Sequence, residues 1–260
     1  MSDAEIVLQD LDMGYGGFIL MKDLNFTVNK GDIFMIMGGS GCGKSTLLKI
    51  MIGLKEPAKG RVFYGATSFW ESDPEERGLM MRRFGILYQN GALWTSMTLA
   101  ENIALPLEHY TNLSRNDIRD MVSLKLALVG LAGFEDFHPS ELSGGMKKRA
   151  GLARAMALDP DIYFFDEPSA GLDPVSAHML DDLILQIRDS LGSTFVVVTH
   201  ELASIFAIGD NSVYLDSDTR TMIAGGDPKK MLAASTEPNV RNFLTRGEDS
   251  SRAANRENRS

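Results

Sequence analysis

The chain has 260 residues, and 35 acidic against 26 basic side chains leave a net charge of −9. This acidic balance argues against a protein whose affinity depends on neutralising many nucleic-acid phosphates, so no nucleic-acid partner is expected. A hydrophobic content of 44% is enough for a core, and the length suits one large domain or one domain with an inserted subdomain.

The single cysteine excludes an internal disulfide framework and a cysteine-ligated zinc site, and it suits a reducing compartment. No apolar run approaches the ~18 residues that a transmembrane helix needs. The acidic start, MSDAEIVLQD, lacks the basic and then apolar layout of a signal peptide. We therefore expect a cytoplasmic protein.

Alternating Leu24, Phe26 and Val28 predict a strand with one solvated face. Three continuously apolar runs predict strands that are buried on both faces. These runs are residues 33–37, 162–165 and 195–198. Helical stretches separate them, and this order predicts an α/β fold with a parallel sheet.

The pattern becomes mostly helical between about residues 88 and 158. Ser114 and Asp117 have the spacing of a capping box, for a helix that runs to Val129. Further along, one apolar helical face is predicted before Gly192. Its members are Leu180, Leu183, Ile184, Ile187 and Leu191.

These elements predict a single domain over residues 5–245. Its core comprises residues 5–87 and 159–245, and a helical subdomain is inserted at about 88–158. Residues 246–260 are predicted to form a disordered tail, because the stretch from Gly247 onward holds no aromatic or large aliphatic side chain. No internal repeat is present, so the chain carries one copy of any functional unit.

The strongest motif is a glycine-rich loop that fits G-x-x-x-x-G-K-S, between a buried strand and an apolar helix at 46–52. Its glycines let several backbone N–H groups point at one phosphate, and the helix N-terminus adds positive potential. Lys44 would reach the β- and γ-phosphates, and the Ser45 hydroxyl would bind Mg²⁺. The loop predicts binding of a nucleoside triphosphate through Gly38, Gly39, Ser40, Gly41, Cys42, Gly43, Lys44, Ser45 and Thr46.

Two carboxylates, Asp166 and Glu167, end the apolar run at 162–165. Because ligands bind at the carboxyl ends of strands in open α/β sheets, both should face the phosphates. Asp166 suits Mg²⁺ coordination, and Glu167 suits orienting and deprotonating the water that attacks the γ-phosphate. Without the glycine-rich loop, these two carboxylates would fit a strand that simply ends in solvated acidic residues. Together with the glycine-rich loop, they favour a hydrolase over a passive nucleotide binder.

Further segments resemble the ATP-binding cassette (ABC) ATPases. LSGGM at 142–146 resembles the signature motif, and Gln89 resembles the Q-loop glutamine. AGLD at 170–173 resembles the D-loop, and His200 resembles the switch histidine. Tyr15, which is predicted in a turn before the second strand, resembles the A-loop aromatic that stacks on adenine. The order and spacing of these motifs hold from about residue 5 to 245.

The resemblance implies a P-loop NTPase (RecA-like) core with an antiparallel β subdomain and an inserted helical subdomain. It implies ATP and Mg²⁺ as cofactors, with Ser45, Gln89 and Asp166 on the metal and with His200 at the γ-phosphate beside the base Glu167. Two cassettes would pair head to tail as a homodimer. Ser143, Gly144 and Gly145 of one copy would then contact the ATP held by the other, across an interface that includes Asp173.

The signature motif departs from the common family pattern at Met146, where most members carry Gln, and the D-loop departs at Ala170, where many carry Ser. We expect function to survive both changes, because the phosphate contacts come from Ser143 and backbone groups. The helix predicted at 147–158 has an apolar face of Met146, Ala150, Ala153 and Ala157. Its basic residues are expected to form a solvated face; they are Lys147, Lys148, Arg149 and Arg154.

A finer resemblance is to the cassette subunits of Mla-type systems, which move phospholipids between the membranes of Gram-negative bacteria. The matching stretches are residues 89–94, 101–107, 139–146 and 237–244. The resemblance implies a polytopic inner-membrane permease, an MCE-domain protein and a small STAS-domain protein as partners. It would place the chain on the cytoplasmic face of the inner membrane, with a coupling helix of the permease in a groove between core and helical insertion.

Two other readings stay open from the sequence. A soluble ABC ATPase, such as the iron–sulfur cluster assembly type, is also a single acidic cassette. An importer of small solutes would share every ATPase residue, because the membrane partner selects the substrate. A DNA-repair or chromosome-structuring ATPase is disfavoured, because Lys44 and Asp166 lie only 166 − 44 = 122 residues apart, without the long coiled coils of those proteins.

Overall fold

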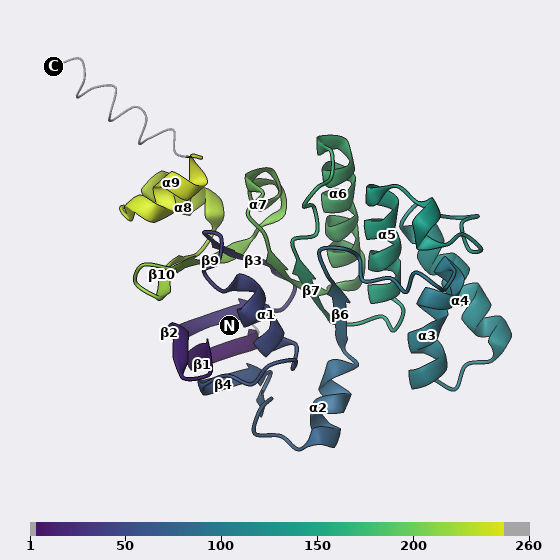
Figure 1. The fold of residues 1–260 in the computed structure, drawn as a ribbon, viewed down its shortest axis with the longest axis horizontal. Coiled ribbons are helices and arrows are strands. Elements are labelled where there is room, and N and C mark those ends of the chain that lie inside the picture. Colours follow the sequence, from purple (N-terminus) through teal and green to yellow (C-terminus); the bar gives the residue numbers. More distant parts are fainter. Residues whose placement is uncertain (1–3, 247–260) are drawn as a thin grey trace, which may run out of the picture. The chain divides into compact units, whose positions relative to one another are not determined.

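The computed structural model describes residues 4–246 (Figure 1). The chain divides into two compact units. The first contains the residues up to Asp73 and those from Val198 onward, and the second is Pro74–Val197. The tail predicted over 246–260 lies outside the described residues apart from Arg246.

The first unit contains an antiparallel sheet with the strand order β2-β1-β4-β5. Its strands are β1 (Ala4–Tyr15), β2 (Phe18–Asn29), β4 (Lys59–Tyr64) and β5 (Thr67–Ser68). Leu24 and Val28 of β2 are buried while the intervening Asn25 and Thr27 are exposed, which confirms the predicted strand with one solvated face. This sheet is the antiparallel β subdomain that the family resemblance implied.

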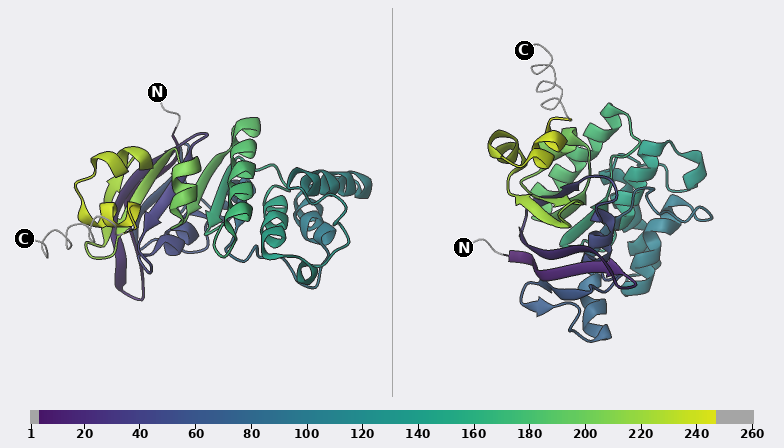
Figure 2. Two further views of the ribbon diagram at one scale, coloured as in Figure 1. Left: turned by 90° about the horizontal axis from the view of Figure 1, so that it is seen from above. Right: turned by 60° about the vertical axis from the view of Figure 1, so that its left-hand side comes forward.

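The first unit also holds β3 (Ile33–Gly38), β9 (Asn211–Asp216) and β10 (Thr221–Gly225), in the order β10-β9-β3. β3 pairs in parallel with β9 and is buried along its whole length, as its apolar run predicted. The helices of this unit are α1 (Lys44–Met51), α7 (Leu202–Ile208), α8 (Pro228–Ala234) and α9 (Pro238–Leu244). Helix α8 packs against α7, β10 and α9, and Figure 2 shows α8 and α9 side by side.

The strands of the second unit run in the order β8-β7-β6. They are β6 (Phe84–Leu87), β7 (Ile162–Asp166) and β8 (Thr194–Val198), which ends at the unit boundary. Tyr163 of β7 stacks on Phe195 of β8 at 4.6 Å between ring centroids, and Phe165 meets Phe195 edge-on at 5.5 Å. These buried aromatic contacts confirm the two-sided burial predicted for both strands.

The helices of the second unit are α2 (Pro74–Met81), α3 (Leu99–Tyr110), α4 (Arg115–Leu128), α5 (Gly144–Ala155) and α6 (Pro174–Leu191), with a short 3₁₀ turn at Pro139–Glu141. Helices α3, α4 and α5 pack on one another (Figure 2). The predicted capping box is present, because the Ser114 hydroxyl accepts the Asp117 N–H while the Asp117 carboxylate accepts the Ser114 N–H. Within residues 4–246, none of the helices is both long enough and apolar enough to cross a membrane.

Two local predictions differ from the structure. Leu191, predicted on the buried face of α6, has 55% of its surface exposed, because it occupies the last turn before Gly192 ends the helix in the left-handed conformation. The prediction is correct for Leu180, Ile184 and Ile187. Tyr15, predicted within a turn, is instead the last residue of β1, since the turn itself consists of Gly16 and Gly17.

Candidate functional site

The predicted site residues fall into two groups. The first unit carries Tyr15, the loop at 38–46 and His200, while the second carries Gln89, residues 143–145, Asp166, Glu167 and Asp173.

The phosphate loop starts where β3 ends against β9. Gly38 has a φ of 147°, and a Cβ there would lie 2.4 Å from the Leu215 carbonyl oxygen. Gly43, with a φ of 102°, would place a Cβ 2.8 Å from the Leu20 and Met13 side chains. Gly38 therefore requires glycine for both its backbone conformation and its space, whereas Gly43 requires it for its positive φ, because the atoms it would meet are the ends of flexible side chains.

Helix α1 begins directly after this loop, and its N-terminus is open to an anion. Gly43 is its N-cap, no side chain supplies a capping hydrogen bond, and the first turn holds no acidic residue. Lys44 is only 9% exposed, and its Nζ donates to the carbonyl oxygens of Gly38 and Gly39, both at 2.9 Å. The loop thus combines a helix dipole with a cation held by main-chain carbonyls, which fits a polyphosphate.

Cys42 lies inside the same loop but is 1% exposed. Burial raises the pKa of its thiol, and the nearby Lys44 charge opposes this only in part. The thiol therefore stays protonated at neutral pH.

Tyr15 lies beside the start of α1. Its ring is 53% exposed, and its hydroxyl lies 3.2 Å from Thr46 Oγ1. The Lys55 ammonium lies 4.2 Å from the ring centroid, as a cation–π contact. An exposed aromatic ring anchored to the phosphate-loop helix is a suitable stacking surface for a purine. Lys55 belongs to no sequence motif that would predict this contact.

His200 follows Thr199, whose N–H donates to the Ile36 carbonyl of β3 at 3.4 Å. This bond ties the segment before the histidine to the strand that leads into the phosphate loop. The His200 side chain is exposed, and its Nε2 lies 3.7 Å from a carboxylate oxygen of Glu201.

In the second unit, β7 ends in the two predicted carboxylates. Burial raises the pKa of Tyr88, at the end of neighbouring β6, and the negative charge of Asp166 raises it further, which indicates that the two side chains are close. Glu167 has a φ of 50°, a left-handed conformation that costs an L residue about 1–3 kcal/mol and that clusters at functional sites.

The prediction of a solvated basic face on the signature helix is wrong for three of its four residues. Lys148 is buried and donates to the carbonyls of Glu167 and Ala170. Arg149 donates to the carbonyls of Val129 and Gly130, and Arg154 to that of Ala92. These carbonyls lie outside strands or at helix ends, and the long side chains of α5 supply hydrogen bonds to them.

Helix α5 begins at Gly144, earlier than predicted, with Ser143 as its N-cap. The Ser143 Oγ accepts the Met146 N–H at 3.3 Å, so its hydroxyl hydrogen can still be donated. Of the predicted apolar face, Ala150, Ala153 and Ala157 are buried, whereas Met146 is only half-buried.

Asp173 is the N-cap of α6. Its carboxylate accepts the backbone N–H groups of Val175 and Ser176 at 3.1 and 3.0 Å, and the Ser176 hydroxyl at 2.5 Å. The bonds from Ser176, with that from Val175, lower the pKa of Asp173. This D-loop aspartate is therefore ionised and held in place at neutral pH.

Gln89 follows β6 and is exposed. The loop that follows lies close against α5: a Cβ on Gly151 would lie 2.9 Å from the Gly91 carbonyl oxygen, and Arg154 holds the Ala92 carbonyl. Gln89 also lines a cavity of about 610 Å³, together with residues of the signature helix and the D-loop such as Lys148 and Ala170. Within the second unit, the structure thus brings the Q-loop, signature helix and D-loop together.

The donor set fits magnesium rather than a softer metal. Over residues 4–246, no three His, Cys, Asp or Glu side chains form a cluster that could hold a metal by themselves. The predicted ligands are a hydroxyl, a carboxylate and an amide oxygen, from Ser45, Asp166 and Gln89. Such hard oxygen donors suit Mg²⁺, which usually takes few protein ligands and completes its shell with substrate phosphates and water.

Comparisons with known proteins agree with this arrangement. The family model described as ABC transporter matches residues 21–170, more than half of the chain. The MlaF intermembrane phospholipid transport ATP-binding proteins of Haemophilus influenzae and Escherichia coli K12 are 39% and 37% identical, over 89% and 91% of this chain and 87% of each relative.

The probable ribonucleotide transport ATP-binding protein mkl of Mycobacterium tuberculosis is 41% identical over 92% of this chain, which spans only 66% of that relative's length. Among solved structures, a dimer of the ATP-binding cassette MJ0796 bound to ADP and Pi gives a TM-score of 0.77 at 29% identity, covering 85% of this chain and 98% of the other. Clostridium perfringens cbiO1, part of an ABC transporter complex, gives 0.81 at 26% identity, with coverage of 89% and 91%. The phosphate loop, the carboxylates of β7, the signature helix and these similarities together show that the chain belongs to the ABC transporter ATP-binding family, with an ABC ATPase fold and MlaF among its homologues.

Proposed function

We propose that this chain hydrolyses ATP to power a permease that moves phospholipids between the inner and outer membranes. The observation that carries the proposal is the similarity to MlaF, which extends over nearly the whole of both chains. We further propose that residues 5–245 act as one ABC domain, with residues 88–158 as its helical part.

The proposed chemistry assigns one task to each side chain. Lys44 and the N-terminus of α1 bind the β- and γ-phosphates, and Tyr15 stacks on adenine. Glu167 orients and deprotonates the attacking water, while His200 contacts the γ-phosphate. Ser45, Gln89 and Asp166 would hold Mg²⁺, which supplies charge neutralisation on the phosphate oxygens when it is bound.

A homodimer completes the proposed ATP sites. The dimeric cassette bound to ADP and Pi is a structural relative of this chain at 29% identity. Ser143 sits at the N-terminus of α5 with a hydroxyl hydrogen to donate, and the N-terminus of this helix favours an anion. We propose that Ser143, Gly144 and Gly145 contact the γ-phosphate held by the other copy, with Asp173 at the interface.

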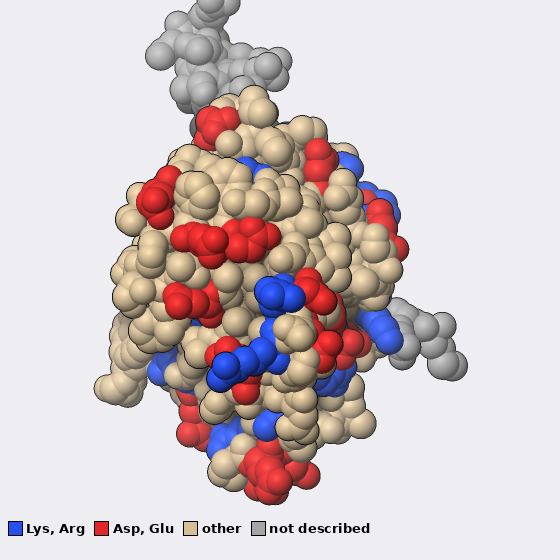
Figure 3. Space-filling model, turned by 90° about the vertical axis from the view of Figure 1, so that its right-hand side faces the viewer, with Lys and Arg blue, Asp and Glu red and all other residues tan. Residues whose placement is uncertain are grey.

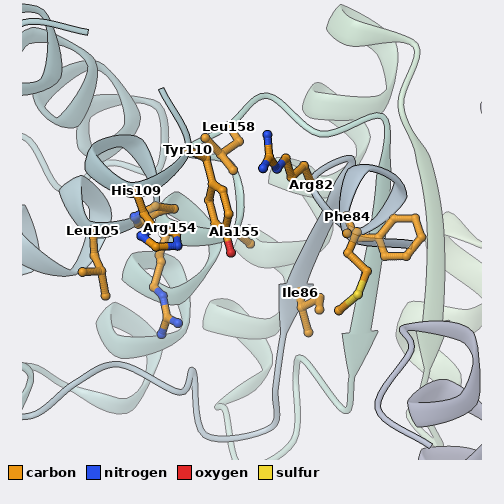
Figure 4. Close-up of a pocket in the computed structure, with 12 residues that line it drawn as sticks. Arg82, Phe84, Ile86, Leu105, His109, Tyr110, Arg154, Ala155 and Leu158 are labelled. Carbon is orange, nitrogen blue, oxygen red and sulfur yellow. The ribbon is translucent and has the colours of Figure 1, made fainter. Parts of the chain in front are cut away.

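A cavity of the second unit supports a site for the permease. It measures about 610 Å³ and is lined by β6, α3 and the end of α5, as Figure 4 shows for Phe84, Leu105, Tyr110 and Ala155. Tyr110 is exposed, and the guanidinium carbon of Arg82 lies 5.1 Å from the centroid of the Tyr110 ring. We propose that a short coupling helix of the permease binds here and follows the motions that ATP drives.

An MCE-domain protein and a STAS-domain protein are proposed as further members of the complex, which would place this chain on the cytoplasmic face of the inner membrane. The face in Figure 3 carries interspersed acidic and basic side chains. That distribution and the net charge of −9 support a protein partner rather than a nucleic acid.

The test is reconstitution. The chain and its permease complex are placed in liposomes with a fluorescent phospholipid, and ATP-dependent lipid movement is measured, with Glu167→Gln as the inactive control. The proposal predicts lipid movement that requires both ATP and Glu167. Hydrolysis without lipid movement would refute phospholipid as the cargo.

A second candidate cargo is a ribonucleotide, which the name of the mycobacterial relatives favours. The same liposomes, loaded with labelled ribonucleotides, distinguish the two cargoes. Transport of ribonucleotides without lipid movement would establish this alternative.

A further inference from the structure

Lys148 is a buried cation whose partners lie in the catalytic segment. It is 6% exposed, within the second turn of α5. Its Nζ donates to the Ala170 carbonyl at 2.9 Å and to the Glu167 carbonyl at 3.2 Å. Burial lowers the pKa of Lys148, and the negative charge of Glu167 opposes this shift. A residue that merely solubilised the helix would keep its ammonium in water.

The segment that Lys148 holds is itself unusual. Glu167 has the left-handed φ of 50°, which L side chains rarely adopt, so surrounding contacts must maintain it. The Glu167 carbonyl accepts a second hydrogen bond, from the Ala170 N–H at 3.3 Å, which closes the turn. Lys148, which lies on α5, therefore holds both ends of the turn that runs between Glu167 and Ala170.

We propose that Lys148 is a positioning residue for hydrolysis, which fixes the backbone that carries the Glu167 carboxylate and links it to the helix that starts at Ser143. The inference rests on the proposed roles of Glu167 as the base and of Ser143 at the γ-phosphate. Through this link, contact of Ser143 with the ATP of the other copy sets the position of Glu167 in its own chain. Lys148 thereby helps to couple the two ATP sites of a dimer.

The positions next to Lys148 provide the control. Lys147 precedes it on the same helix and is half-buried, so Lys147→Met makes the same chemical change without removing the two bonds to the catalytic segment. Lys148→Met keeps the length of the side chain and removes its donors. Lys148→Arg keeps a cation with several N–H donors at the same position.

The purified chain is assayed for kcat, KM, ATP affinity and melting temperature. We expect Lys148→Met to lower kcat by about 10- to 100-fold, the scale of a misplaced reacting group, with KM and ATP affinity within about twofold of wild type. Lys148→Arg should recover most of kcat, and Lys147→Met should match wild type. In hydrogen exchange, the backbone amides of residues 167–172 should exchange faster in Lys148→Met alone.

Four outcomes separate the failure of this inference from the failure of the proposed function. A lower melting temperature with kcat unchanged would reduce Lys148 to a structural anchor and overturn the inference. An unchanged exchange rate at residues 167–172 would also overturn it. Wild-type turnover by Glu167→Gln would instead refute the proposed base, whereas an inactive Glu167→Gln beside a fully active Lys148→Met would refute only the role of Lys148.

Discussion

The phosphate loop makes a quantitative prediction for Lys44→Met. The Lys44 ammonium is nearly buried, and two hydrogen bonds of 2.9 Å to the Gly38 and Gly39 carbonyls hold it in the loop. A hydrogen bond to a charged group contributes about 1.5–3 kcal/mol. Methionine has a similar length and no donor, so one such bond to phosphate is lost. The Kd for ATP should then rise about 10- to 150-fold, because about 1.4 kcal/mol corresponds to a factor of ten.

Isothermal titration calorimetry with ATP measures this change, and the melting temperature shows that the variant is folded. Lys49→Met is the matched control, because Lys49 is an exposed lysine on the same helix and its side chain faces solvent. An ATP affinity of the Lys44 variant equal to that of the control would refute the assignment of this loop to phosphate binding.

Three other predictions test the remaining parts of the site. Glu167→Gln should keep ATP binding but lower kcat by ~10²–10⁴, the span of general-base catalysis, and near wild-type turnover would exclude this role. Because burial raises the pKa of Cys42, alkylation of its thiol should be slow at neutral pH and should accelerate as the pH rises toward that raised pKa. Bound ATP should block the alkylation. Equal labelling with and without ATP, measured by mass spectrometry, would argue against the assignment of this loop to phosphate binding. The lowered pKa of Asp173 means that its cap on α6 stabilises the fold above the pKa of the unfolded state, and that this contribution is lost as the pH falls through the folded-state pKa. Asp173→Ala should therefore lower the melting temperature at neutral pH and weaken the dependence of the melting temperature on acid pH. Asp173→Asn should keep the cap and lose only this pH dependence. Identical melting curves for the wild type and both variants would contradict this.

Several parts of the fold were readable from the sequence because they depend on near neighbours in the chain. The run before Gly38 had no polar residue to place in water, so burial on both faces was its only stable arrangement. Ser114 and Asp117 cap a helix through bonds within four residues of chain. The predicted starts of two helices are wrong, because α1 and α5 each begin earlier than predicted.

The basic residues of α5 show where such reasoning fails. A lysine on a helix has the same local pattern whether its ammonium meets water or a carbonyl oxygen. Lys148 is buried because a turn from a distant part of the chain places the carbonyls of Glu167 and Ala170 opposite it. Leu191 is the converse case, since its apolar periodicity continues past the last turn that packs.

By itself, the sequence determined the phosphate loop, the carboxylates at the end of β7 and the succession of buried strands, because each is encoded in a short stretch whose chemistry has few alternatives. Only the tertiary structure decided which cations are solvated and which hold the catalytic segment, and that the Glu167 backbone is left-handed. The physical reason is that a hydrogen bond to a remote carbonyl leaves no periodicity in the sequence, whereas burial of a whole strand does.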